Sequence, residues 1–163
     1  MTADEHYHLR RIERDMPDRA DQLAVLRSQK YLSLAMACDN QPYLVSLNYA
    51  FSEEENCFYV HSAPQGRKIE MLRANPRVWG QVIEDRGYLP GQCSHAYRSV
   101  MFEAWAEFVA DLEEKRRALA IMIVHADPDA AEALQQRLVA TSDLAQVTVI
   151  RLTVVSLGGK QGP

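Results

Sequence analysis

The sequence has few cysteines, no C-x-x-C pair and no cluster of metal-ligand residues, and these absences exclude several classes of protein. Its three cysteines, Cys38, Cys57 and Cys93, are odd in number and widely spaced. This pattern argues against a disulfide framework or a zinc knuckle and favours a reducing compartment. We therefore expect a cytoplasmic protein without a structural metal site.

Long apolar runs and an excess of basic charge are also missing. No apolar stretch approaches the about 18 residues that a membrane helix requires. The first 15 residues lack the apolar segment of a secretory signal. The 18 Lys and Arg residues face 22 Asp and Glu residues, for a net charge of -4. This balance argues against a general surface for nucleic acid or for an anionic membrane, so we expect neither as a partner.

The hydrophobic pattern predicts a mainly β protein, a β-barrel with flanking helices. Alternating residues predict six strands, over residues 31–38, 42–51, 57–62, 77–85, 96–110 and 146–157. Short turns join most of them, which favours antiparallel pairing and a small closed barrel without exposed edges. Helices are predicted over residues 18–29, 67–75, from 111 onward, and after Asp127-Pro128. We expect residues 1–163 to form one domain, with residues 1–16 as a loose arm.

The segment from His61 to Lys68 is the strongest candidate site. A strand ends there, a turn containing Gly66 follows, and Arg67 and Lys68 open a helix. Free backbone N–H groups at a helix start, beside two cations and the Ser62 hydroxyl, are suited to binding a phosphate. The competing interpretation is a surface turn followed by two exposed cations. Neither a Walker loop nor a G-x-G-x-x-G motif occurs.

No hydrolytic or metal-binding motif accompanies this anion site. The sequence contains neither G-x-S-x-G nor H-E-x-x-H, and the His6/His8 pair in the charged N-terminus is weak evidence for a metal. His61 is the one histidine inside a predicted strand next to the turn, so it is a candidate for substrate contact or proton donation. A phosphate site without an evident acid, base or nucleophile is typical of a protein that leaves its chemistry to a cofactor.

Five segments resemble the pyridoxamine 5′-phosphate oxidase-like flavoproteins, and within them the Nim-type nitroimidazole-resistance branch. They are P-Y-L-V-S-L-N-Y at 42–49, H-S-A-P-Q-G-R-K at 61–68, R-A-N-P-R at 73–77, Y-R-S-V at 97–100 and the closing Gly159-Lys160. The resemblance implies a six-stranded antiparallel split β-barrel of Greek-key type that binds FMN. It also implies a homodimer with a flavin at each end of the interface. We expect Trp79, Trp105 and Tyr97 to contribute to the surface that the partner covers.

The resemblance also implies which residues bind FMN. Arg67 and Lys68 would hold the phosphate, the backbone of the strand over 45–48 would contact the isoalloxazine ring, and 97–99 would complete the site from within the chain or across the dimer. The implied cofactor residues are Val45, Ser46, Leu47, Asn48, Ser62, Ala63, Gly66, Arg67, Lys68, Tyr97, Arg98 and Ser99.

The leading functional hypothesis is an FMN-dependent oxidoreductase that reduces a small compound, with a nitroaromatic as one candidate, by hydride transfer through flavin N5. NAD(P)H is one candidate electron donor. The segment with which true pyridoxamine phosphate oxidases hold their substrate finds no match after Lys160, so that reaction is not expected. Three alternatives remain open: a haem-binding or haem-handling split barrel, a non-catalytic flavin-binding dimer, and use of a deazaflavin.

Overall fold

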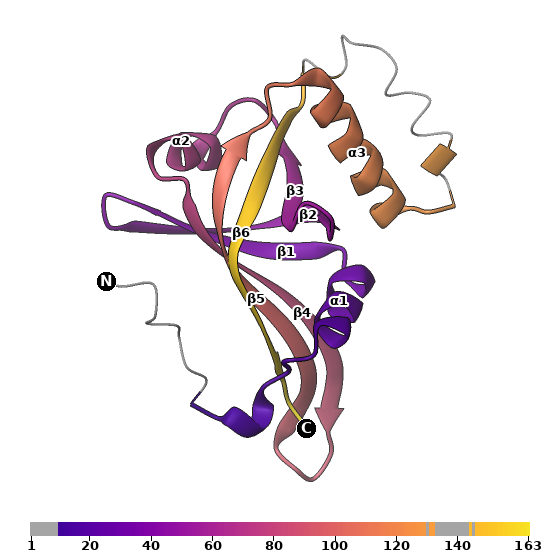
Figure 1. The fold of residues 1–163 in the computed structure, drawn as a ribbon. Helices are drawn as coiled ribbons and strands as arrows, with labels where there is room; N and C mark the ends of the chain where they lie inside the picture. Colours follow the sequence, from indigo (N-terminus) through magenta and orange to yellow (C-terminus); the bar gives the residue numbers. More distant parts are fainter. Residues whose placement is uncertain (1–9, 130, 133–143, 145) are drawn as a thin grey trace.

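The chain folds into a β-barrel with α-helices packed around it (Figure 1). The structure, a computed structural model, describes residues 10–129, 131–132, 144 and 146–163. In this part of the chain the elements are a short 3-10 helix η1 (Ile12–Arg14), α1 (Arg19–Ser28), β1 (Tyr31–Cys38), β2 (Gln41–Ser52), β3 (Cys57–Ser62), α2 (Arg67–Ala74), β4 (Arg77–Leu89), β5 (Ser94–Phe108), α3 (Leu112–Ala126) and β6 (Thr148–Gln161).

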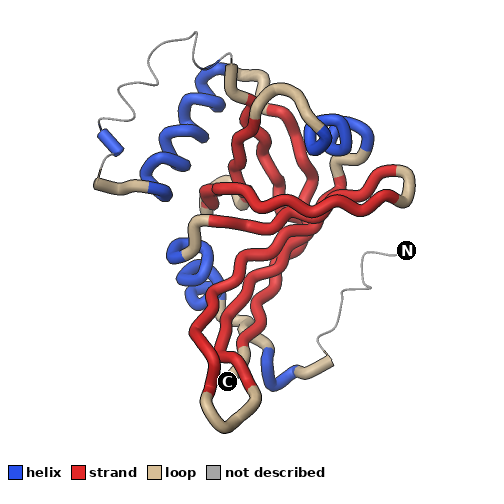
Figure 2. The backbone as a smooth tube through the Cα atoms, turned by 180° about the vertical axis from the view of Figure 1, so that it is seen from behind, coloured by secondary structure: helices blue, strands red, loops and turns tan. Residues whose placement is uncertain are grey.

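The six strands close into a ring in the order β1-β2-β3-β6-β5-β4, and every neighbouring pair is antiparallel. This confirms the predicted barrel. β4, β5 and β6 are longer than the other strands and continue past the ring as an arm (Figure 2). No helix within the described residues is long and apolar enough to cross a membrane.

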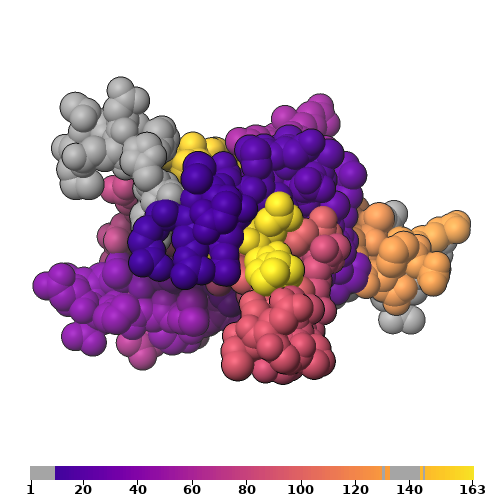
Figure 3. Space-filling model, turned by 90° about the horizontal axis from the view of Figure 1, so that it is seen from below, coloured from indigo at the N-terminus to yellow at the C-terminus, as the bar shows by residue number. Residues whose placement is uncertain are grey.

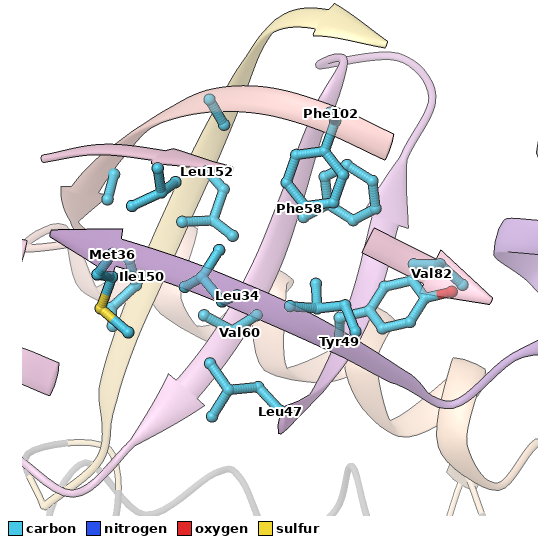
Figure 4. Packing of buried hydrophobic residues seen from close by; sticks show 14 of the residues in the cluster. Leu34, Met36, Leu47, Tyr49, Phe58, Val60, Val82, Phe102, Ile150 and Leu152 are labelled. Atoms are coloured by element: carbon cyan, nitrogen blue, oxygen red, sulfur yellow. The ribbon is translucent and has the colours of Figure 1, made fainter. Parts of the chain in front are cut away.

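Alternate residues of the strands fill the barrel (Figure 4). In β2, Leu47 and Tyr49 are buried in the core, as the alternation predicts, and Phe51 packs against it. The rings of Phe58 and Phe102 stack at the centre, with centroids 4.0 Å apart and planes 17° from parallel. A second cluster lies outside the ring, where α3 covers the outward residues of β2, β3 and β6.

A capping aspartate explains where each of the two longer helices, α1 and α3, begins. The Asp18 side chain accepts a hydrogen bond from the Ala20 N–H at 2.7 Å, and Asp111 accepts one from Glu114 at 2.8 Å. Such caps satisfy backbone donors that have no partner inside the helix. The buried face of α3 includes Ala118, Leu119 and Met122, whereas Leu112 in its first turn is exposed. The helix predicted after Asp127-Pro128 falls mostly outside the described residues.

Two further predictions differ from the structure. β4 does not end at Asp85, as predicted, but continues through an irregularity to Leu89. The N-terminal arm is anchored before its predicted end at residue 16. Asp15 bridges to Lys160, and the buried Met16 donates its N–H to the Gly159 carbonyl at 3.2 Å. Figure 3 shows the first described residues (indigo) beside the end of β6 (yellow).

Candidate functional site

The start of α2 has the free donors that the sequence predicts. Gly66 is the residue before the helix and has a φ of 122°, which side chains rarely tolerate. Its carbonyl accepts the N–H groups of Ile69 and Glu70. The N–H groups of Arg67 and Lys68 have no recorded acceptor in the described part of the chain, and no side chain caps the helix. This end of α2 therefore presents positive charge and open donors.

Ser62, the last residue of β3, is buried just before this turn. The residue is 8% exposed, and its hydroxyl is the one buried side-chain oxygen or nitrogen without a hydrogen-bond partner in the described residues. A buried hydroxyl without a partner costs about 1–3 kcal/mol. A ligand oxygen that reached Ser62 Oγ would remove this cost. The residue therefore fits a phosphate group at the start of α2.

The two cations of the segment point to different neighbours. The Arg67 guanidinium lies over the Tyr43 ring, with Cζ 4.6 Å from the ring centroid. Lys68 is half-buried and lies close enough to His61 to affect its titration. Neither cation forms an ion pair within the described residues. Both charges therefore remain uncompensated and available to an anion.

His61 lies on the outer side of the barrel, one position before Ser62. It pairs with Val149 of β6. The protein around its ring, and then the nearby Lys68 ammonium, lower the pKa of His61 below its ordinary value of 6.5. The imidazole is thus neutral near pH 7, and it acts as a proton donor only after taking up a proton.

The segment Val45–Asn48 forms an open edge of the barrel next to this site. It pairs with β1, whereas β2 pairs with β3 only from Tyr49 to Ser52. Beyond Val60, β3 likewise pairs only with β6. In the described structure, the facing edges of β2 and β3 thus carry backbone groups without a strand partner. Such an edge can hydrogen-bond to a flat heterocycle.

Tyr97, Arg98 and Ser99 lie elsewhere in the same chain. They are on the arm of β5, paired with Ile83–Asp85 of β4 and with the end of β6. Arg98 donates to both oxygens of Glu84, at 2.5 and 3.2 Å, and this contact raises its pKa and lowers that of the carboxyl. Within one chain, these residues therefore belong to the arm formed by β4, β5 and β6. Completion across a dimer stays a prediction.

Sequence reasoning did not identify Tyr43 or the groove beside it. The groove has a volume of about 340 Å³ and is open to solvent; its lining residues are Cys38, Gln41, Arg67, Glu70, Met71 and Ala74. Only the alternation of β2 could have indicated Tyr43, because it is on the same face as Val45 and Leu47. Nothing in the sequence shows that this face reaches α2.

A second surface feature is an apolar area on the outer side of the barrel. Five large apolar side chains from β2, β4 and β5 remain 40–64% exposed: Leu44, Trp79, Ile83, Met101 and Trp105. Exposed apolar areas of this kind mark contact surfaces. Tyr97, predicted for the same surface, is half-buried. Gly162 packs on its ring and donates its N–H to the Tyr97 carbonyl at 2.8 Å.

Comparison with known proteins assigns the family. The family model described as pyridoxamine 5′-phosphate oxidase matches residues 18–161. The chain belongs to this family. The family prediction is therefore confirmed, and with it the predicted split-barrel fold.

Several solved structures resemble the chain over most of its length. A candidate 5-nitroimidazole antibiotic resistance protein from Bacteroides thetaiotaomicron is 25% identical, with 96% of both chains covered and a TM-score of 0.75. An FAD-binding protein from Mesorhizobium loti is 29% identical, and the match covers 90% of this chain and 96% of that protein with a TM-score of 0.65. An FAD and haem binding protein from Mycobacterium smegmatis shares the fold at 15% identity, with 91% and 73% covered and a TM-score of 0.78.

One curated relative matches a shorter region. It is an uncharacterized protein, RA0666, of Rhizobium meliloti (strain 1021), 45% identical over 51 residues. The match spans 31% of this chain and 32% of that relative's length.

Proposed function

We propose that the chain binds a flavin nucleotide, FMN, with the phosphate at the start of α2. The observation that carries this proposal is the buried Ser62 hydroxyl without a partner, next to a helix end with free N–H groups. Arg67 and Lys68 add two cations that no carboxylate compensates among the described residues. A phosphate with close to two negative charges needs such a local concentration of cations, because the whole chain carries a net charge of -4.

The flavin ring would lie along the open edge of β2 from Val45 to Asn48. The backbone N–H and C=O groups there that point away from β1 have no strand partner in the described structure, and they match the polar edge of an isoalloxazine ring. Asn48 Nδ2 donates to the Lys30 carbonyl at 3.3 Å, which holds this part of β2 against the start of β1. Ala63 and Gly66 would border the phosphate without adding bulk. Bound flavin supplies hydride transfer through N5, and the chain supplies the binding.

The proposed activity is reduction of a small compound, with nitroaromatic compounds as the class to test first. The similarity to a candidate nitroimidazole resistance protein supports this choice. His61, neutral near pH 7, would contact the substrate through a ring nitrogen. A non-catalytic flavin-binding protein is the alternative. It predicts bound flavin that NAD(P)H and other donors fail to reduce.

We also propose that two copies pair through the outer apolar surface formed by Leu44, Trp79, Ile83, Met101 and Trp105. A partner's Tyr97–Ser99 segment would then be able to approach the flavin site. Light scattering of the purified protein should give twice the monomer mass of 18.5 kDa. The Trp79→Ser, Trp105→Ser variant should shift toward monomer, and a stable wild-type monomer would contradict the proposal.

The phosphate site is tested by fluorescence titration with FMN and riboflavin. Hydrogen bonds to charged groups contribute about 1.5–3 kcal/mol each, so loss of one should weaken FMN binding about ten- to a hundredfold. The Arg67→Ala, Lys68→Ala double variant should bind FMN no better than riboflavin. Arg73→Ala is the matched control, because it removes a cation from the other end of α2, where it lies over Phe108. Equal wild-type affinity for both ligands would show that 61–68 is only a surface turn.

A haem-binding function is the second candidate, because the FAD and haem binding protein from Mycobacterium smegmatis shares the fold. The absorption spectrum of the purified protein separates the candidates. Flavin gives two bands near about 375 and 450 nm, whereas haem gives an intense Soret band. Chromatography of the released cofactor then distinguishes FMN from FAD and from a deazaflavin.

A further inference from the structure

Three arginines of the described structure lie over an aromatic ring: Arg19 over Phe51, Arg67 over Tyr43 and Arg73 over Phe108. Of these, Arg67 is the one at the proposed phosphate site. Arg98 and Arg151 both have their guanidinium groups against carboxylates, Glu84 in one case and Glu107 with Glu114 in the other. The recorded contact of Arg67 in the described structure is with the face of an aromatic ring, and it forms no ion pair there. Its charge is held in place without being neutralised.

We propose that Tyr43 is a positioning residue that holds the Arg67 guanidinium ready for the phosphate of the bound nucleotide, and so makes the chain prefer phosphorylated flavin to riboflavin. The proposal rests on the proposed function, because it takes the start of α2 as the phosphate site.

The geometry of stacking explains why the ring positions the cation without blocking it. A guanidinium is planar, and its five N–H donors lie in its plane. A ring over one face therefore leaves the donors at the edge free for the oxygens of a phosphate. Arg67 also borders the open groove along α2, so its exposed edge faces space that a ligand can enter.

Positioning matters because Arg67 is otherwise mobile. The side chain is exposed and has no hydrogen bond within the described residues. A free arginine loses rotamer freedom when it binds an anion, and a contact that restricts it beforehand reduces this loss. Tyr43 suits this role, because it is half-buried in β2 opposite Met36 of β1 and packs on the barrel core. The partner of the cation is thus part of the rigid barrel.

Lys68 provides an internal comparison. It follows Arg67 directly but lies near His61 on the outer side of β3. Tyr43 should therefore affect the contribution of Arg67 to phosphate binding and leave that of Lys68 unchanged. A merely structural role for Tyr43, in holding β2 against α2, would affect FMN and riboflavin equally.

The test measures the ratio of riboflavin to FMN dissociation constants for Tyr43→Leu, which keeps an apolar side chain but removes the ring. Exposed cation–π contacts correspond to about a two- to fivefold change in affinity. FMN binding should weaken by this factor, while riboflavin binding stays at the wild-type value. Tyr43→Phe is the control, since it keeps the ring face, and it should retain the wild-type ratio.

A double-mutant cycle assigns the effect to Arg67. Tyr43→Leu should add nothing in an Arg67→Ala background and should act at full strength in a Lys68→Ala background. Arg67→Lys gives a second measurement that does not touch the core. It keeps the charge but lacks the planar fork, so the preference for FMN should fall.

The outcomes separate the two proposals. An equal loss for both ligands in Tyr43→Leu, an undiminished effect without Arg67, or an unchanged ratio in Arg67→Lys would each overturn the role of Tyr43 and leave the phosphate site standing. A wild-type protein that binds FMN no better than riboflavin would overturn the phosphate site as well.

Discussion

Replacing Gly80 by alanine should strongly destabilise the barrel, because the added methyl group would overlap the ring of Phe102. Gly80 of β4 faces inward and pairs with Phe102 of β5. A Cβ at this position would lie 2.0 Å from Phe102 Cζ and 2.4 and 2.6 Å from the two Cε atoms. Carbon atoms in ordinary contact are about 3.5–4.0 Å apart, so the ring would have to move.

The ring of Phe102 has little room to retreat. The ring stacks on Phe58 at 4.0 Å, and Phe58 in turn packs against Tyr49 and Phe51. Overpacking of a core typically costs about 1–3 kcal/mol, and a rigid aromatic stack leads us to expect at least about 3 kcal/mol here. Urea unfolding followed by fluorescence should show this loss as a lower midpoint with an unchanged m-value.

Gly158→Ala is the matched control, since it also adds a methyl group to a glycine in a strand. No atom lies within 4 Å of the Cβ it would create. It should change the free energy of unfolding by less than about 0.5 kcal/mol. Phe102→Leu should partly rescue Gly80→Ala, so the double variant should be more stable than the sum of the two losses predicts. Equal stability of Gly80→Ala and Gly158→Ala would refute the argument.

Two further outcomes are expected. Asp111→Ala should cost about 1 kcal/mol by removing the cap of α3, whereas Asp111→Asn keeps an acceptor and should cost less; thermal unfolding measures both, and equal losses would contradict the role of the cap. The folded pKa of His61 lies below the unfolded value, so the native state binds fewer protons between the two values. Its contribution to stability is therefore present above about pH 6.5 and is lost as the pH falls through that window. NMR titration should show a low pKa that FMN raises and riboflavin does not, and a pKa at or above 6.5 in the free protein would show that this environment does not act on the ring.

Alternation made the strands of the ring predictable from sequence. β1 and β3 begin and end at the predicted residues. β1 alternates between core and outer face, whereas β3 has a short apolar run that is buried on both faces, because α3 covers its outer side. The end of β4 was missed for a physical reason. Gly87, Pro90 and Gly91 are typical of a loop, but pairing with β5 carries the strand past Gly87. There Asp85 accepts the Gly87 N–H at 2.8 Å, and the Tyr88 and His95 rings meet edge to face.

The candidate site was only partly visible in the sequence. The segment 61–68 contains its own turn, glycine and cations, so local reasoning found it. The role of Tyr97–Ser99 depends on where β5 runs, and the arm of β4 and β5 carries these residues away from α2 in the same chain. Tyr43 lies in the 42–49 segment of the family resemblance, but nothing in that segment indicates a contact with Arg67. It was missed because its relation to Arg67 exists only once β2 and α2 have packed together.

The distribution of paired charges explains how an acidic chain can offer a phosphate site. The overall excess of acidic residues predicts repulsion of anions, but in the fold many carboxylates form ion pairs with arginines. Glu55 pairs with Arg117, Glu84 with Arg98, and Glu107 with Arg151. At the start of α2 the Arg67 guanidinium lies over the Tyr43 ring and forms no ion pair in the described structure, so its charge stays uncompensated. Affinity for a dianion then depends on this local imbalance, which only the tertiary pairing of charges creates, and not on the net charge of the chain.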